Sequence, residues 1–96
     1  MPEATDGIPV IHNREEQRFE TLVAGQRAVC EYQIEGDRMV FTHTFVPPEL
    51  RGRGIAEKLV RVALECAQGE KRRVVPACSY VAAYIQRRPE LRTLIG

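Results

Sequence analysis

The amino-acid sequence predicts a mixed α/β (α+β) fold, in which a mostly antiparallel sheet is followed by a β-α-β-α second half. Three observations predict this class. Apolar and polar residues alternate between residues 18 and 46, a helical period begins near Arg53, and a short apolar strand with a second helical pattern follows. A strand that returns after a helix implies a parallel crossover in the second half of the sheet.

The alternating region divides into three predicted strands, at residues 18–23, 27–35 and 38–46. Gly25 supplies the first turn. Gly36 and Asp37 suit a two-residue hairpin loop, because glycine tolerates the positive φ that such tight turns require. Two prolines at residues 47 and 48 end the third strand, since proline has no N–H to give to a ladder.

The hairpin fixes an expected register for its two strands. Counting back from the loop with strict alternation puts four pairs on one face of the sheet: Ile34 with Met39, Tyr32 with Phe41, Cys30 with His43, and Ala28 with Phe45. This register predicts that His43 lies in an apolar row.

The second half contains two predicted helices. The first runs from about Arg53 to Gly69, with apolar residues at helical spacing. A short strand is predicted at residues 74–75. Ser79 is the expected N-cap of a second helix, which continues through about Arg87 and is closed by Pro89. The carboxyl ends of strands in such a crossover sheet are the usual ligand position.

The 96 residues provide for a single domain, which we expect at residues 10–96 after a flexible leader at residues 1–9. The formal charge of +1 and the lack of clustered aromatic residues argue against a nucleic-acid partner. No apolar run is long enough to cross a membrane, and we expect a cytoplasmic monomer or weak dimer. Three cysteines and two histidines at unrelated spacings predict neither a disulfide framework nor a metal site.

The glycine-rich turn at residues 51–54 is the clearest candidate for ligand binding. Gly52 and Gly54 allow a tight turn, and the helix that follows presents unpaired N–H groups and the positive end of its dipole. Arg51 and Arg53 add donors suited to phosphate oxygens. By itself the turn fits either an anion site or a solvated loop. The dinucleotide-binding and P-loop patterns are both incomplete here.

Three motifs, taken together, resemble a known family. Residues 46–56 (VPPELRGRGIA) resemble the Q/R-x-x-G-x-G/A acetyl-CoA motif of the GCN5-related N-acetyltransferase superfamily. Residues 43–47 (HTFVP) and 76–84 (PACSYVAAY) resemble two further motifs of its small single-domain branch. The resemblance covers about residues 10–91. It implies a minimal acyl-CoA N-acyltransferase fold whose groove is open on one face, since the chain has no room for two helices that larger members carry.

The resemblance also implies a ligand and its contacts. The expected co-substrate is acetyl-CoA, and the acceptor is an amine of a small molecule or a protein. The turn would bind the pyrophosphate through its amides, and the strand end before it would pair with the pantetheine arm. From their i,i+4 spacing alone, two tyrosines of the last helix either cover the coenzyme or close the core. The expected coenzyme-binding residues are Phe45, Val46, Arg51, Gly52, Arg53, Gly54, Ile55, Ala56, Tyr80 and Tyr84.

Cys78 and His43 are the catalytic candidates. Cys78 comes just before a helix, where the dipole favours a thiolate, and an acetyl-cysteine route is one hypothesis; direct transfer to the amine is the simpler one. The imidazole of His43 is suited to proton transfer near neutral pH. Each residue has an inert alternative, as a buried thiol or a core histidine. A non-catalytic acyl-CoA-binding module or sensor therefore stays open, and Cys30 and Cys66 are interpreted as core residues.

Some residues depart from the pattern of the family. Many relatives have an acid after the His-Thr pair, where this chain has Phe45. The basic residues 71–73 and 87–88 fit either the 3′-phosphate of coenzyme A or a solvated edge. The departure at Phe45 suggests that the acceptor, or the level of activity, differs from those relatives.

Overall fold

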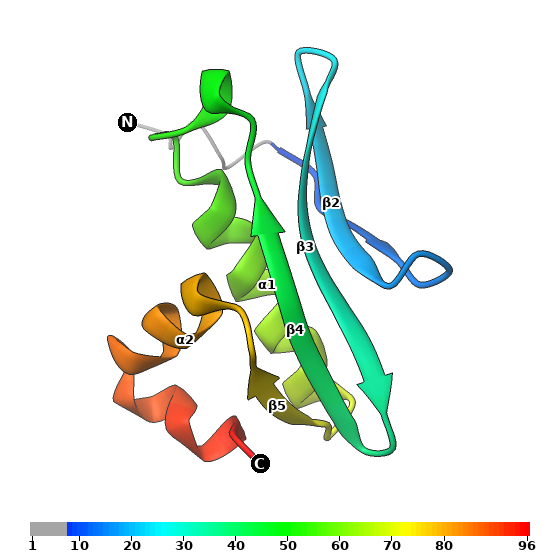
Figure 1. The fold of residues 1–96 in the computed structure, drawn as a ribbon, viewed down its shortest axis with the longest axis vertical. Helices are drawn as coiled ribbons and strands as arrows, with labels where there is room; N and C mark the ends of the chain where they lie inside the picture. The colour runs from blue at the N-terminus through cyan, green and yellow to red at the C-terminus, as the bar shows by residue number, and fades with distance from the viewer. Residues whose placement is uncertain (1–7) are drawn as a thin grey trace.

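A computed structural model describes residues 8–96, which form one five-stranded sheet with two α-helices (Figure 1). The strands are β1 (Ile11–Asn13), β2 (Arg18–Val23), β3 (Gln26–Glu35), β4 (Arg38–Phe45) and β5 (Arg73–Pro76), in this spatial order. The helices are α1 (Ile55–Gly69) and α2 (Ser79–Gln86), with 3₁₀ turns at Pro48–Leu50 and Pro89–Leu94. The predicted fold class and the order of the predicted elements are confirmed.

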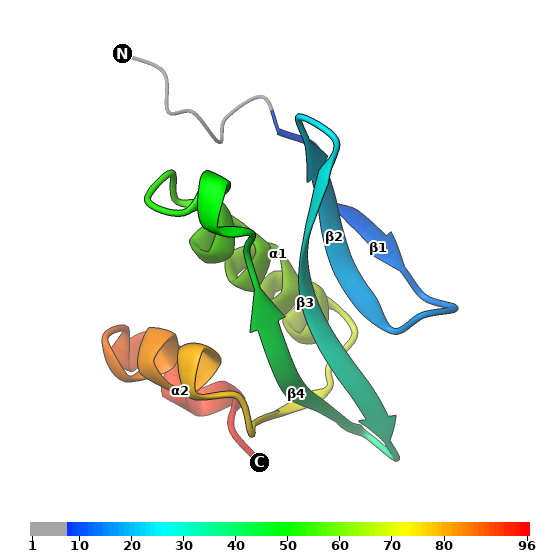
Figure 2. The same ribbon diagram turned by 45° about the horizontal axis from the view of Figure 1, so that its top comes forward.

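The first four strands form an antiparallel meander, and β5 returns beside β4 in the parallel direction. The α1 helix is the crossover between β4 and β5, and it lies across one face of the sheet (Figure 2). The hairpin loop is where the sequence predicts it, with Gly36 at φ +63°. β1 was not predicted, because three residues are too few for a period to be read.

β5 pairs with β4 only from Arg38 opposite Arg73 to Phe41 opposite Pro76. Beyond this point β4 stays paired with β3 but continues without β5 toward the glycine turn, while the chain leaves β5 to begin α2 (Figure 1). The amide of Cys78 closes the fork by donating to the carbonyl of Phe41 at 2.8 Å. The two neighbouring strands are therefore splayed at their carboxyl ends.

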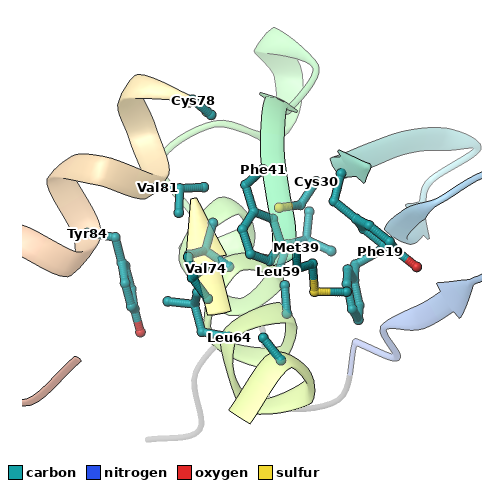
Figure 3. Close-up of a cluster of buried hydrophobic side chains, with 14 of the residues drawn as sticks. Phe19, Cys30, Met39, Phe41, Leu59, Leu64, Val74, Cys78, Val81 and Tyr84 are labelled. Atoms are coloured by element: carbon teal, nitrogen blue, oxygen red, sulfur yellow. The ribbon is translucent and has the colours of Figure 1, made fainter. Parts of the chain in front are cut away.

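The core lies between the sheet and the two helices (Figure 3). Phe41 from β4 and Val74 from β5 are completely buried, as are Leu59 of α1 and Val81 of α2. Each large apolar side chain buried in this way contributes about 1.5–3 kcal/mol. These contacts fix α1 and α2 against the sheet, and so they fix the two helix N-termini that flank the splayed strands.

The predicted register of the hairpin is correct near the loop and wrong beyond it. Ile34 pairs with Met39 and Tyr32 with Phe41, but a β-bulge follows, so that Glu31 pairs with His43 and Cys30 with Thr44. The extra residue is Thr42, on β4. A bulge adds one residue to one strand and exchanges the faces of all residues after it.

Two smaller expectations are also corrected. The N-cap of α2 is Cys78, not Ser79, and its backbone is extended at φ −79° and ψ 131°. Cys66 is only half-buried rather than a core residue, whereas Cys30 is fully buried as expected. Residues 1–7 of the predicted leader lie outside the described residues, and Ile8 packs against the core.

Candidate functional site

The glycine turn leads directly into α1. Gly52 and Gly54 both have left-handed backbones, at φ +81° and +77°, and Gly54 is the N-cap of the helix. Only glycine adopts this conformation without steric cost. The amides of the first helical residues, from Ile55 to Glu57, have no carbonyl of the helix to bond, so the turn collects N–H donors at the positive end of the α1 dipole.

Arg51 joins the turn to the end of β4. Its Nε donates a hydrogen bond to the carbonyl of Val46 at 2.9 Å, and its guanidinium lies 5.9 Å from the centroid of the Phe45 ring. Arg53 is exposed and lines neither of the two pockets beside the turn. The sequence predicts the same phosphate-binding role for both arginines, but in the structure only Arg51 lines the pockets beside the turn.

A groove connects the turn to the splayed part of β4. One pocket of about 230 Å³ is lined by Val46, Leu50, Arg51, Gly52, Gly54, Ile55, Ala56, Glu57 and Tyr80. A second pocket, of about 220 Å³, shares four of these residues and adds Thr44 and Phe45. Because they share walls, the two pockets form one open groove, which we call the turn groove.

Cys78 lies at the start of α2 (Figure 3). Its Sγ is 3.5 Å from Oγ1 of Thr44, which lines the groove, and the residue is 8% exposed. Cys78 itself lines neither pocket, so it lies behind the groove wall and meets the groove through Thr44.

The surroundings of Cys78 favour its thiolate. Burial by itself would raise the pKa of the thiol, but the Thr44 hydroxyl and the backbone amides of Val81, Tyr80 and Thr44 outweigh it, and the pKa lies below its ordinary value. Donors directed at a sulfur stabilise negative charge on it. A lowered pKa gives the nucleophilic form a larger share at neutral pH.

His43 lies on the other side of the sheet from Cys78. Its cross-strand partner is Glu31, whereas the neighbouring pair Cys30 and Thr44 faces the helices. The imidazole is exposed and stacks at 6.4 Å with the ring of Phe45. The expected apolar row around His43 is therefore wrong, and the structure does not bring His43 to Cys78.

The two tyrosines of α2 also separate. Tyr80 lines both pockets of the turn groove. Tyr84 is buried one turn further along α2, where it lines a different pocket with residues of α1, and the guanidinium of Arg88 lies 3.9 Å from its ring centroid. Tyr84 is therefore not part of the groove.

The predicted basic residues 71–73 and 87–88 do not line the groove, although Arg88 contacts a residue of its wall, Glu57. Arg72 binds Glu70 and the carbonyl of Gly36, at the hairpin end of β4, which is the opposite end from the turn. Arg88 forms an ion pair with Glu57 at 2.9 Å. This arrangement favours the interpretation of residues 71–73 as a solvated edge.

A comparison with protein families now adds to this geometry. Residues 18–94 match the model of the GCN5-related N-acetyltransferase family. The chain belongs to this family. The match includes the glycine turn, Thr44, Cys78 and the whole of α2, so the residues that line the turn groove lie within the matched range.

The chain is also similar to proteins of vertebrates. The protein NATD1 of Mus musculus is 36% identical over 85 residues, covering 85% of this chain and 77% of its own length. The protein NATD1 of Bos taurus is 36% identical over 91 residues, covering 92% of this chain and 80% of its own length. These relatives extend the resemblance over almost the whole described domain.

A solved structure agrees in fold. The NMR structure of a GCN5-like protein from Staphylococcus aureus matches with a TM-score of 0.74, covering 95% of this chain and 90% of its own, at 18% identity. At this identity the match supports the fold alone: the five-stranded sheet with its splayed strands has the acetyltransferase fold.

Sequence reasoning missed three residues of the groove in this acetyltransferase: Thr44, Leu50 and Glu57. Leu50 lies inside the recognised motif and Glu57 follows it directly, so the motif was an available signal for both. Thr44 lies in the HTFVP motif, but the bulge that turns its side chain toward Cys78 is not visible in the sequence. In residues 8–96, no set of three or more His, Cys, Asp or Glu side chains is arranged to hold a metal ion, and no helix there is long and apolar enough to span a membrane.

Proposed function

We propose that this acetyltransferase binds acetyl-CoA in the turn groove and transfers the acetyl group to an amine. One observation carries the proposal: a single groove runs from an amide-rich helix N-terminus to Thr44, whose hydroxyl contacts a thiol whose surroundings favour the thiolate. The first feature suits the pyrophosphate of a coenzyme. The second suits the carbonyl of its thioester.

The pyrophosphate end is supported by the donor set of the turn. Main-chain amides at Gly52 to Ala56 and the N-terminal end of α1 attract an anion. The N–H groups of Arg51 lie beside them and form charge-assisted hydrogen bonds with phosphate oxygens. Glu57 is the one acid in the pocket wall, and its ion pair with Arg88 compensates its charge.

The pantetheine end is supported by the splay of the strands. From Thr42 onward β4 has no partner strand on the α2 side, because β5 ends opposite Phe41. Main-chain groups at such an edge accept an extended amide-containing chain as they accept another strand. This edge leads from the turn toward Cys78.

The covalent route begins with attack of the Cys78 thiolate on the thioester carbonyl carbon. A bond forms between Sγ and that carbon, the bond from the carbon to the coenzyme sulfur breaks, and the coenzyme leaves as a thiolate that takes up a proton. A neutral amine then attacks the acetyl-cysteine. The C–N bond forms, the C–S bond breaks, the Cys78 thiolate is regenerated, and the amine nitrogen loses a proton.

Direct attack of the amine on acetyl-CoA is the other route. It needs the same groove but no bond to Cys78. A role for His43 in deprotonating the amine stays a prediction in both routes, and from its position it would act from the outer face of the sheet. The amine can belong to a small molecule or to a protein.

The intact-protein mass after incubation with acetyl-CoA separates these possibilities. We expect an acetyl adduct on Cys78 in the wild type and in Cys66→Ala, and none in Cys78→Ala. Transfer to an amine panel without an adduct would favour direct attack. Binding without adduct or transfer would make the protein a coenzyme-binding module, and no binding in calorimetry at millimolar acetyl-CoA would overturn the proposal.

A further inference from the structure

The β-bulge decides which side chain of β4 faces Cys78. Met39 and Phe41 are buried against the helices, so strict alternation would put His43 next on that face. The extra residue Thr42 moves His43 to the outer face and puts Thr44 in its place. The sulfur of Cys78 therefore meets a hydroxyl and not an imidazole.

Thr44 has contacts on both sides. Its Oγ1 is 3.5 Å from Sγ of Cys78 and 3.8 Å from Sγ of Cys30. Cys30 is fully buried, and burial raises the pKa of its thiol to about 12, so Cys30 stays protonated. Thr44 itself is half-buried and lines the turn groove. Its hydroxyl therefore lies between the groove, a protonated thiol and the proposed nucleophile.

A threonine hydroxyl has one hydrogen to donate and can accept in addition. While Cys78 is a thiol, its S–H can donate to Thr44 and the hydroxyl hydrogen can turn to Cys30. When Cys78 loses its proton, the hydroxyl gains more by donating to the charged sulfur, because charge-assisted hydrogen bonds are roughly twice as strong as neutral ones. A rotation about one C–O bond serves both states.

We propose that Thr44 is the positioning residue of Cys78: it holds the sulfur against the wall of the turn groove and stabilises it as a thiolate. The proposal deepens the proposed function, on which its effect on acetyl transfer rests. Its effect on the thiol needs only the geometry around Cys78. The backbone amide of Thr44 and those at the start of α2 act on the sulfur in the same direction.

The test is the pH dependence of iodoacetamide alkylation at Cys78, followed by mass spectrometry of the Cys78 peptide in the absence of acetyl-CoA. In Thr44→Val, which keeps the shape and removes the hydroxyl, we expect the midpoint to rise by about one pH unit. In Thr44→Ser we expect it to return to within a few tenths of the wild-type value. Thr42→Val is the matched control, since it makes the same change at an exposed residue, and its midpoint should be unchanged.

Two results would overturn the proposal: an unshifted midpoint in Thr44→Val, or a Thr44→Ser variant as shifted as Thr44→Val. Circular dichroism monitors folding of each variant. If Thr44→Val does not fold, Thr44→Ala removes the same hydroxyl from a smaller side chain and carries the same expectation.

Acetylation of the same variants separates this proposal from the proposed function. If the wild type forms no acetyl adduct but the alkylation midpoint is shifted in Thr44→Val, the covalent route is overturned and the pairing of Thr44 with Cys78 is supported. If the wild type forms the adduct but the alkylation midpoint is unshifted in Thr44→Val, the covalent route is supported and the role of Thr44 is overturned. If both proposals hold, Thr44→Val forms the adduct about tenfold more slowly at neutral pH, because one pH unit changes the thiolate fraction tenfold.

Discussion

Two thiols in this molecule, the half-buried Cys66 and the buried Cys78, have opposite surroundings. Cys66, on α1, lies 3.7 Å from Nδ1 of His12 and donates a hydrogen bond to Glu70 at 3.4 Å. Burial, followed by that bond, raises its pKa. Cys78, at the start of α2, instead lies beside a hydroxyl and main-chain amides that can donate to its sulfur, and its pKa is lowered. Proximity to a histidine is thus a poorer guide to a reactive cysteine than the direction of the hydrogen bonds at the sulfur.

The two regions differ for a topological reason. Around Cys66 the sheet is continuous, and side chains of β1, β3 and α1 satisfy one another: Tyr32 and His12 share a hydrogen bond of 2.5 Å, and Arg14 holds Glu70 at 2.6 Å. Around Cys78 the strands splay, so main-chain groups and a groove replace side-chain partners. The first region holds the edge strand β1 against α1, and we call its residues His12, Arg14, Tyr32, Cys66 and Glu70 the His12 clamp. The second region leaves room for a ligand.

The largest expected effect is the difference in reactivity between the two thiols. Near pH 7.5 we expect iodoacetamide to modify Cys78 at least about tenfold faster than Cys66, because only the thiolate reacts and the two pKa values move in opposite directions from about 8.5. Cys30, with a pKa of about 12 and no exposure, should not react in the folded protein. Peptide-resolved mass spectrometry over time measures the rates. Equal rates at Cys66 and Cys78 would break the comparison.

A matched pair of glycines tests whether the splayed region binds the coenzyme. Gly52 and Gly25 have similar φ values, +81° and +77°, and a Cβ at either would meet no atom within 4 Å. Alanine at each should cost about 1–2 kcal/mol of stability through backbone strain. Only Gly52→Ala should also weaken acetyl-CoA binding in calorimetry, by about three- to tenfold, since only Gly52 lines the groove. Equal affinities in the two variants would remove the turn from the binding site.

The His12 clamp should make the stability of the folded protein depend on pH. Burial, and then the nearby Arg14, lower the pKa of His12 below its ordinary value of 6.5. The folded state therefore binds this proton less readily than the unfolded state, so the stabilisation is complete above pH 6.5 and is lost as the pH falls below it. Denaturant unfolding of the wild type from about pH 7.5 to 5.5 should show this decline, and His12→Gln should flatten it.

Glu70, in the same His12 clamp, should cause a second decline in stability at a lower pH than the decline caused by His12. The Arg14 and Arg72 hydrogen bonds lower the pKa of its carboxyl to about 2, from an ordinary 4.5. Its contribution is therefore present above pH 4.5 and is lost as the pH falls toward 2. In Glu70→Gln the decline below pH 4.5 should be shallower, while the decline near pH 6 should persist. A variant that flattened both steps would show that the two groups titrate as one.

The smallest expected effect belongs to His43. Because it lies on the outer face of the sheet, His43→Ala should leave the alkylation midpoint of Cys78 unchanged and alter stability by no more than about 0.5 kcal/mol. The measurements are those used for Thr44→Val. A midpoint that moved as far as in Thr44→Val would mean that the imidazole reaches the sulfur in solution.

The fold was predictable wherever a period extends over several residues. Strict alternation located β2, β3 and β4 within a residue or two, and the helical spacing from Ile55 located α1. The three residues of β1 carry no period, and their pairing with β2 depends on the packing of His12 against Phe19 at 4.1 Å. A strand held by a tertiary contact has no local signal to read.

The candidate site divides along the same line. The sequence by itself determined the glycine turn, because positive φ at Gly52 and Gly54 is a local backbone property, and it determined that a cysteine and a tyrosine follow the last strand. Only the tertiary structure decided which β4 side chain meets Cys78. One extra residue in the ladder exchanges His43 for Thr44, and a bulge arises from the pairing of two strands and their packing against the helices, not from the residue at which it occurs.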